Sequence, residues 1–155
     1  MERFVIVRSN RLNAFGTKLN SDICRVVNMF CDSTCVHKIE KEMRLFFHIN
    51  LPERLFNQEL VDVEEENIII FDGHVRTEFL NWMMKNNPQK RIILWLWNTV
   101  DEVKKNLRLD CIPKEIEIWS YSEHDCKKYG FNYNTTFFWD RKKKMESEIA
   151  QDLYF

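Results

Sequence analysis

A short polar motif, Asp72-Gly73-His74, carries the side chains of this chain best suited to acid–base chemistry. Histidine exchanges a proton near neutral pH, and Asp72 can orient it or accept a proton from a substrate hydroxyl. Gly73 lets the backbone turn sharply, and Arg76 can grip a carboxylate or phosphate. We therefore treat Asp72 and His74 as candidate catalytic residues, and Gly73 and Arg76 as candidate substrate contacts. The structural alternative is that Asp72 caps the following helix and His74 is merely exposed.

Two further clusters hold candidate substrate contacts. Trp97 can stack on a sugar ring, and the amide of Asn98 beside it can recognise hydroxyl groups. The alternative for this cluster is that Trp95 and Trp97 both fill the interface between a helix and a sheet. Ser120 and Ser122 form the third cluster, for which the alternative is a helix cap.

Aromatic and basic side chains meet in residues 137–144. We call Arg141, Lys142, Lys143 and Lys144 the basic segment. Together with Trp139, it fits the surface of an anionic membrane, with the ring at the interface and the cations over the headgroups. We expect these five residues to be membrane-proximal. The alternative is a solvated run of charge after a packed aromatic loop.

The sequence lacks the motifs of metal, dinucleotide and nucleic-acid binding. Its five cysteines have no paired metal-ligand spacing, and an odd number without a secretory leader indicates reduced cytosolic thiols. It has no glycine-rich phosphate loop. Its net charge of −1 gives no excess of positive charge for binding nucleic acid. We expect no metal and no cofactor in this domain, and a cytoplasmic location that allows peripheral contact with the inner face of the plasma membrane.

Four apolar runs predict the strands that position these clusters, at residues 4–7, 67–71, 91–97 and 115–119. The run at 91–97 does not alternate, which is typical of a central parallel strand covered on both faces. The run at 115–119 alternates and is expected nearer an edge. With helices in between, the pattern predicts an α/β fold, a Rossmann-like open parallel sheet flanked by helices. Ligands bind such sheets beyond the carboxyl ends of the strands, where the three clusters fall.

Apolar spacing and capping residues predict the helices. Positions 23, 26, 27 and 30 repeat at helical spacing after Ser21, which predicts a helix there. A second helix is expected at about residues 75–86, stopped by Pro88, and a short third one at 101–107. Ser122 is the expected N-cap of a helix over 122–129, with Asp125 completing a variant capping box and Gly130 ending the helix.

Three segments carry a family resemblance: Ile68-Ile-Ile-Phe-Asp72, Asn86-Asn-Pro-Gln-Lys-Arg-Ile-Ile-Leu-Trp-Leu-Trp-Asn98, and residues 117–134. Residues 67–155 resemble bacterial proteins from capsule and lipopolysaccharide gene clusters, which are described as glycosyltransferase-like; the first 66 residues resemble them weakly. The resemblance implies a two-domain, GT-B-like enzyme. Residues 1–155 would be its single Rossmann-like, acceptor-side domain. Because the chain ends within an apolar run, we expect a second, donor-binding domain to follow.

The resemblance also implies a function. A full-length protein of this kind would transfer a sugar from a nucleotide-sugar donor to a glycan or lipid-linked acceptor in the biosynthesis of capsule, exopolysaccharide or lipopolysaccharide. His74 or Asp72 would activate the acceptor hydroxyl, and Arg76 and Asn98 would position the acceptor. Without its donor half, the domain would be inactive.

The alternative function is a non-catalytic Rossmann-like interaction module or a receiver-type module. In a receiver, Asp72 would be the phosphorylated residue at a strand end. A receiver also needs an acidic pair after its first strand, where this chain has Ser9 and Asn10. The sequence therefore favours the transferase over the receiver.

Overall fold

The computed structural model describes residues 2–8, 23–31, 51–72, 75–104 and 107–134. Within them, six strands form one open sheet, and every neighbouring pair is parallel. Their order across the sheet is β2-β1-β3-β4-β5-β6. The strands are β1 (Phe4–Arg8), β2 (Cys24–Asn28), β3 (Asn67–Phe71), β4 (Arg91–Leu96), β5 (Glu117–Ser120) and β6 (Asn132–Tyr133). The chain is therefore an α/β protein, Rossmann-like in kind.

The four strands predicted from apolar runs are confirmed as β1, β3, β4 and β5. β3 and β4 occupy the middle of the sheet, and β5 lies next to the edge strand β6. Their isoleucine and valine side chains favour an extended backbone and pack well on a pleated surface. The continuous apolar run thus correctly indicated a central strand, and the alternating run correctly indicated a strand near the edge.

A strand replaces the helix that the spacing of positions 23, 26, 27 and 30 predicted. β2 pairs in parallel with β1 over its whole length, with Val26 beside Ile6. Branched side chains such as Val26 prefer this extended conformation, and a short helix without a packed face gains little from propensity alone. The predicted helix is therefore wrong. Ser21, its expected cap, lies outside the described residues.

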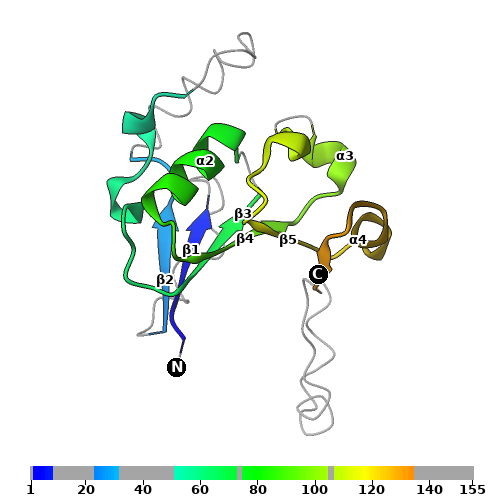
Figure 1. Ribbon diagram of the computed structural model, residues 1–155, viewed down its shortest axis with the longest axis horizontal. Coiled ribbons are helices and arrows are strands. Elements are labelled where there is room, and N and C mark those ends of the chain that lie inside the picture. The colour runs from blue at the N-terminus through cyan, green and yellow to red at the C-terminus, as the bar shows by residue number, and fades with distance from the viewer. Residues whose placement is uncertain (1, 9–22, 32–50, 73–74, 105–106, 135–155) are drawn as a thin grey trace, which may run out of the picture.

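Helices and single turns connect the strands. The 3-10 turns η2 (Glu53–Leu55) and η3 (Gln58–Leu60) precede β3, and α2 (Thr77–Asn86) joins β3 to β4. The segments α3 (Val100–Val103) and η4 (Leu109–Cys111) lead to β5, and α4 (Glu123–Tyr129) leads to β6. Figure 1 shows α2 and α3 on the same face of the sheet and α4 beside β5. None of the helices in the described part of the chain has the length and apolar content needed to span a bilayer.

The main core lies between α2 and the sheet. The apolar spacing in this segment also predicts one helix face formed by Val75, Phe79, Trp82 and Met83. All four are buried, although Val75 lies two residues before Thr77, where the helix begins. They belong to one cluster with Ile70 of β3 and Leu94 of β4. Phe56, between the two 3-10 turns, adds a ring 5.1 Å from that of Phe79. This packing fixes the β3–α2–β4 unit, which carries the first two polar clusters.

The ends of α4 are as predicted, but its capping box is not. The Ser122 hydroxyl accepts a hydrogen bond from the Asp125 amide at 3.2 Å, and Gly130 ends the helix with a left-handed φ of 74°. The Asp125 carboxylate does not complete the predicted box, because it accepts a bond from the Val100 amide at 3.1 Å. The Ser122 amide donates instead to the Ser120 hydroxyl at 3.1 Å. Asp125 therefore joins α4 to the start of α3.

Candidate functional site

The chain reverses its direction across the sheet between β1 and β3. From β1 it continues to β2 on one side, whereas β3, β4, β5 and β6 follow one another on the other side. Ligands of open parallel sheets bind beyond the carboxyl ends of the strands at such a reversal. Arg8 ends β1 at this point, and Asp72 is the first residue after β3. The candidate site is therefore centred on these two positions.

Asp72 is held against the turn that follows β4. Its side chain is buried, and its Oδ2 atom accepts hydrogen bonds from both the backbone amide and the side-chain amide of Asn98, each at 3.1 Å. Its own amide donates to the Trp95 carbonyl at 3.2 Å, which extends the pairing of β3 with β4 by one residue. The structure thus brings together two residues that the sequence singled out separately. We call this pair the Asp72–Asn98 clamp.

Burial dominates the acidity of Asp72. It raises the pKa of the Asp72 carboxyl above its ordinary value, although hydrogen bonds from the Trp97 amide and from both amide groups of Asn98 act in the opposite direction. A carboxylate with a raised pKa is a better proton acceptor than an exposed one. The clamp therefore positions a carboxylate with some basic character at the edge of the sheet where ligands bind.

Asp72 does not cap α2, so that alternative is wrong. The N-cap of α2 is Arg76, four residues further on, and no side chain bonds to the helix amides from that position. Arg76 instead forms a bidentate ion pair with Glu78 in the first turn. Its Nη2 atom lies 2.8 Å from Oε1 and its Nε atom 3.3 Å from Oε2. Both side chains are partly buried. A ligand that used Arg76 would share its guanidinium with Glu78.

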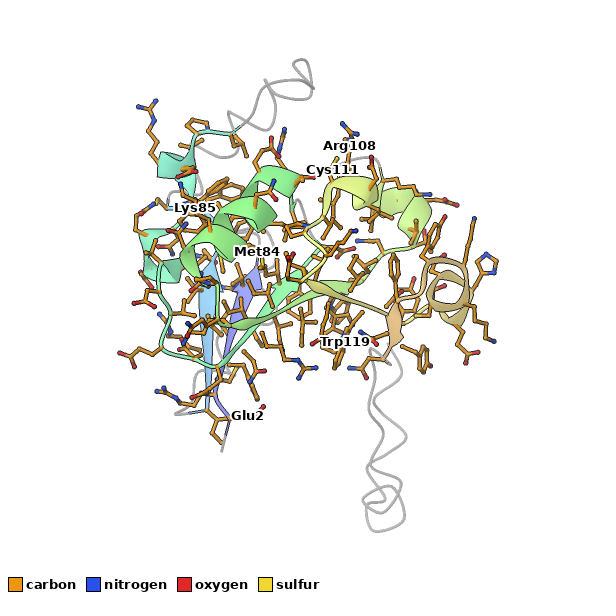
Figure 2. The ribbon with its side chains drawn as sticks, in the orientation of Figure 1. Glu2, Met84, Lys85, Arg108, Cys111 and Trp119 are labelled. Carbon is orange, nitrogen blue, oxygen red and sulfur yellow. The ribbon has the colours of Figure 1, made fainter. Side chains whose placement is uncertain are left out.

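Trp97 lies on the face of the sheet away from α2. Trp95 is beside Phe71 and Trp119 in register, so these three side chains share one face, and Trp97 extends it by two residues. Figure 2 shows Trp119 on the opposite side of the sheet from Met84 and Lys85, which belong to α2. Neither indole therefore lies in the interface between α2 and the sheet, although the Nε1 atoms of both are buried.

The aromatic face, formed by Phe71, Trp95, Trp97 and Trp119, borders the clamp. The Trp97 ring meets the edge of the Phe71 ring at 5.5 Å, with 72° between the planes, and lies 6.3 Å from the Trp95 ring. Trp95 in turn lies 6.5 Å from Trp119. Trp97 remains partly exposed directly after β4, one residue before Asn98. Its position therefore suits a ring that contacts a ligand held at the clamp.

Ser120 and Ser122 are occupied by the local structure of α4. Ser120 is fully buried and its hydroxyl accepts from the Ser122 amide, while Ser122 serves as the N-cap. The cap alternative is confirmed for Ser122. Through Asp125 and Val100, this third cluster connects to the turn that contains Asn98, so the three clusters line one edge of the sheet.

Arg8 is a site residue that reasoning from sequence missed. Its Nε donates to the Asn28 side-chain oxygen at 3.2 Å, at the carboxyl ends of β1 and β2. The available signal was a basic residue at the end of the first predicted strand. The sequence did not reveal the strand order that brings this residue next to β3. The remaining predicted site residues lie outside the described ranges: Gly73, His74, Trp139, Arg141, Lys142, Lys143 and Lys144.

Fold and site define the class of this chain: an α/β protein with a six-stranded, all-parallel open sheet and a buried carboxylate at its winding reversal. Comparisons with known proteins found no matching family model, no matching curated protein and no matching solved structure.

Proposed function

We propose that this chain is the acceptor-side domain of a glycosyltransferase that builds bacterial surface polysaccharide, as the N-terminal half of a GT-B-like protein. The observation that carries the proposal is the Asp72–Asn98 clamp beside Trp97 at the winding reversal of the sheet. Hydroxyl-rich ligands need a flat ring to stack on and paired polar groups that fix their orientation. Trp97 supplies the ring, and the next residue, Asn98, supplies the polar group that Asp72 holds in place.

Each residue has a role in this proposal. Trp97 stacks on an acceptor sugar. Asn98 orients a hydroxyl group through the side-chain amide atoms that are not hydrogen-bonded to Asp72. Asp72, whose pKa is raised by burial, accepts the proton of the attacking hydroxyl, with His74 as the other candidate base. Arg8 and Arg76 provide positive charge on either side of the site, which suits an acceptor that carries a phosphate or carboxylate.

In this proposal, the site that binds the sugar donor lies outside residues 1–155. A nucleotide sugar is the expected donor, and a domain following residue 155 is the proposed place where it binds. An acceptor that is lipid-linked would bring this domain to the inner face of the membrane, in agreement with the role proposed for the basic segment.

Glycan binding by this chain is the first test. We expect a panel of surface-polysaccharide fragments to shift the amide and indole resonances of Trp97 and Asn98 in two-dimensional NMR spectra. Asn98→Ala should weaken this binding about tenfold, the equivalent of one lost hydrogen bond to a polar ligand. Asn81→Ala, an exposed position on α2, is the matched control and should bind like the wild type. Shifts that leave Trp97 and Asn98 unaffected would disprove the acceptor site.

Donor turnover is the second test. The gene product that includes the sequence downstream of Phe155 is incubated with a panel of sugar nucleotides, and release of the nucleotide is measured. We expect one donor to be consumed when the acceptor is present. If no donor is bound or consumed, the transferase proposal fails even if the chain binds glycans.

A receiver-type module is the second candidate. The order β2-β1-β3-β4-β5 occurs in doubly wound folds of this kind, and Asp72 follows the third strand. Against it, β1 ends on Arg8 and the Asp72 carboxylate is already bound by Asn98. Incubation with acetyl phosphate and magnesium tests the receiver: mass spectrometry that finds phosphate on Asp72 supports it, and an unmodified protein rejects it.

A further inference from the structure

The hydroxyl of Tyr129 brings together two lysines from different helices. Lys104 directly follows α3, and Lys128 and Tyr129 close α4. Lys104 Nζ donates to the Tyr129 hydroxyl oxygen at 2.9 Å and lies 4.8 Å from the centre of the ring. Lys128 Nζ lies 5.1 Å from the same ring centre. The ring stacks on Phe131 at 5.5 Å with 22° between the planes, which fixes its position.

The positive charge at this point is not balanced by an ion pair within the described residues. Lys127, one residue away, pairs with Glu123 at 3.5 Å, whereas neither Lys104 nor Lys128 forms a salt bridge in the described part of the chain. The pKa of the Tyr129 hydroxyl is lowered, chiefly by its hydrogen bond with Lys104 and next by the neighbouring Lys128 ammonium. Asp101 and Asp125 act on Lys104 from beyond ion-pair distance. Two like charges beside one tyrosine ring repel each other, and a bound anion would relieve that repulsion.

We propose that Lys104, Lys128 and the Tyr129 hydroxyl bind the phosphate group of a ligand, which is either a soluble phosphate or a lipid headgroup. Two ammonium groups beside one tyrosine ring, together with the hydroxyl of that ring, are donors that match the acceptor oxygens of a phosphate. The site is separate from the clamp, because α4 leaves the carboxyl end of β5 and Tyr129 leads through Gly130 to the start of β6. It does not depend on the proposed transferase function.

The other explanation for these lysines is the helix dipole. Cations near the C-terminus of a helix are stabilising, but α3 has four residues and α4 seven, so both dipoles are short. The two explanations predict different results. Loss of a dipole partner lowers stability without affecting ligand binding, whereas loss of a phosphate contact weakens phosphate binding.

Titration with inorganic phosphate tests the site. We expect saturable NMR shifts at residues 104, 128 and 129, and at least about tenfold weaker binding in the double variant Lys104→Gln/Lys128→Gln, because each lost contact is charge-assisted. Lys127→Gln removes one charge from the same helix and should bind like the wild type. Tyr129→Phe, which keeps the ring and its stacking, should bind more weakly than the wild type. Urea unfolding of each variant verifies that it folds.

Either of two outcomes would overturn the proposal. Absence of shifts at these residues up to about 0.1 M phosphate, where screening is already strong, refutes the site. Equal binding by the double variant also refutes it. Cosedimentation then identifies the source of the phosphate. Because the basic segment is itself expected to bind anionic vesicles, both proteins are compared in the background Arg141→Gln/Lys142→Gln/Lys143→Gln/Lys144→Gln. Sedimentation with phosphatidylglycerol but not with phosphatidylcholine vesicles that is lost on adding Lys104→Gln/Lys128→Gln assigns a lipid headgroup; phosphate binding without sedimentation in this background assigns a soluble ligand.

Discussion

Asp72 is a carboxylate whose ionisation works against folding. Its pKa is raised in the folded chain, chiefly by burial, so the folded state holds the proton more tightly than the unfolded state. The stability that this proton provides is fully present below the unfolded pKa and is lost as the pH rises through the folded pKa. Hydrogen bonds from the Asn98 amides reduce this loss. Asp72 therefore makes the folded chain less stable in neutral solution than in mild acid, although the hydrogen bonds of the clamp favour the ionised carboxylate.

Asp72→Asn tests this pH dependence. The substitution removes the ionisation but leaves an oxygen that can accept from the Asn98 amide. We expect the free energy of unfolding of the variant, minus that of the wild type, to increase as the pH rises from about 4 towards 7. Urea unfolding at a series of pH values measures this difference. Asn81→Ala, at an exposed position on α2 that carries no ionisable group, is the matched control and should leave the pH profile parallel to that of the wild type. A difference for Asp72→Asn that stays constant or shrinks would contradict the assignment.

Single residues of the site could be selected from sequence, but their pairing could not. Asp72 and Asn98 each follow an apolar run, so both were expected at the edge where ligands bind. Their hydrogen bonds join positions 26 residues apart, and no local pattern encodes such a contact. The same holds for Lys104 and Tyr129, which are 25 residues apart and come from two separate helices.

At the scale of elements, β2 shows where local spacing misleads. Apolar positions 23, 26, 27 and 30 lie three and four apart and fit a helix face, yet pairing with a parallel neighbour, β1, makes residues 24–28 a strand. Pairing with β1 satisfies the backbone groups of β2 on one side, a gain that the sequence of β2 alone does not reveal. α4 shows the opposite case, because Ser122 and Gly130 act within a few residues and so fix both helix ends locally.

Ile93 of β4 provides a test of the central strand. It is 4% exposed, and its neighbour in register, Ile69 of β3, is only partly buried. We expect Ile93→Ala to reduce the free energy of unfolding by about 2–5 kcal/mol, through lost burial and the cavity left behind. Ile69→Ala is the matched control and should cost less. Urea unfolding measures both; a loss below about 1 kcal/mol at Ile93 would show that this part of β4 is not tightly packed.

Ser122 provides a test of α4. Its hydroxyl accepts from the Asp125 amide, so Ser122→Ala leaves a first-turn amide without its partner. We expect a loss of about 0.5–2 kcal/mol, the usual range for N-caps. Ser122→Thr keeps the hydroxyl and should stay within a few tenths of a kcal/mol of the wild type, since threonine is also a good cap. Equal losses in the two variants would show that packing, and not the hydrogen bond, makes Ser122 important.

At the scale of the whole molecule, the parallel sheet was predictable but its strand order was not. Alternating strands and helices indicate parallel pairing, because each crossover returns the chain to the same end of the sheet. Whether a crossover leads to the left or the right of the preceding strand is decided by which faces the helices cover. The reversal between β1 and β3, and hence the place of Arg8 at the end of the strand beside β3, is therefore a property of the assembled sheet.

Burial across the sheet also differs in part from expectation. The predicted strands lead us to expect burial of Ile69, Phe71, Ile93, Trp95 and Ile118, and Phe71 and Ile93 are largely buried. The other three are only partly buried. Ile69 and Trp95 lie on the face opposite α2 and α3 (Figure 1), yet their neighbours in register on that face, Ile93 and Phe71, are buried. A run of apolar residues thus indicates a central strand more reliably than it indicates equal burial on both faces.

Membrane contact is a prediction for the molecule as a whole. The basic segment carries four cations, each worth about 1 kcal/mol near anionic lipid, which is enough for weak, reversible docking. We expect the protein to sediment with anionic but not with neutral vesicles, and added salt to release it, because salt screens the attraction. The variant Arg141→Gln/Lys142→Gln/Lys143→Gln/Lys144→Gln should lose this binding. A control with equal net charge, Lys85→Gln/Lys90→Gln/Arg108→Gln/Lys127→Gln, should keep it. If both variants bind equally, net charge and not the basic segment governs the attraction; if the wild type fails to bind at low salt, residues 137–144 are a solvated run of charge.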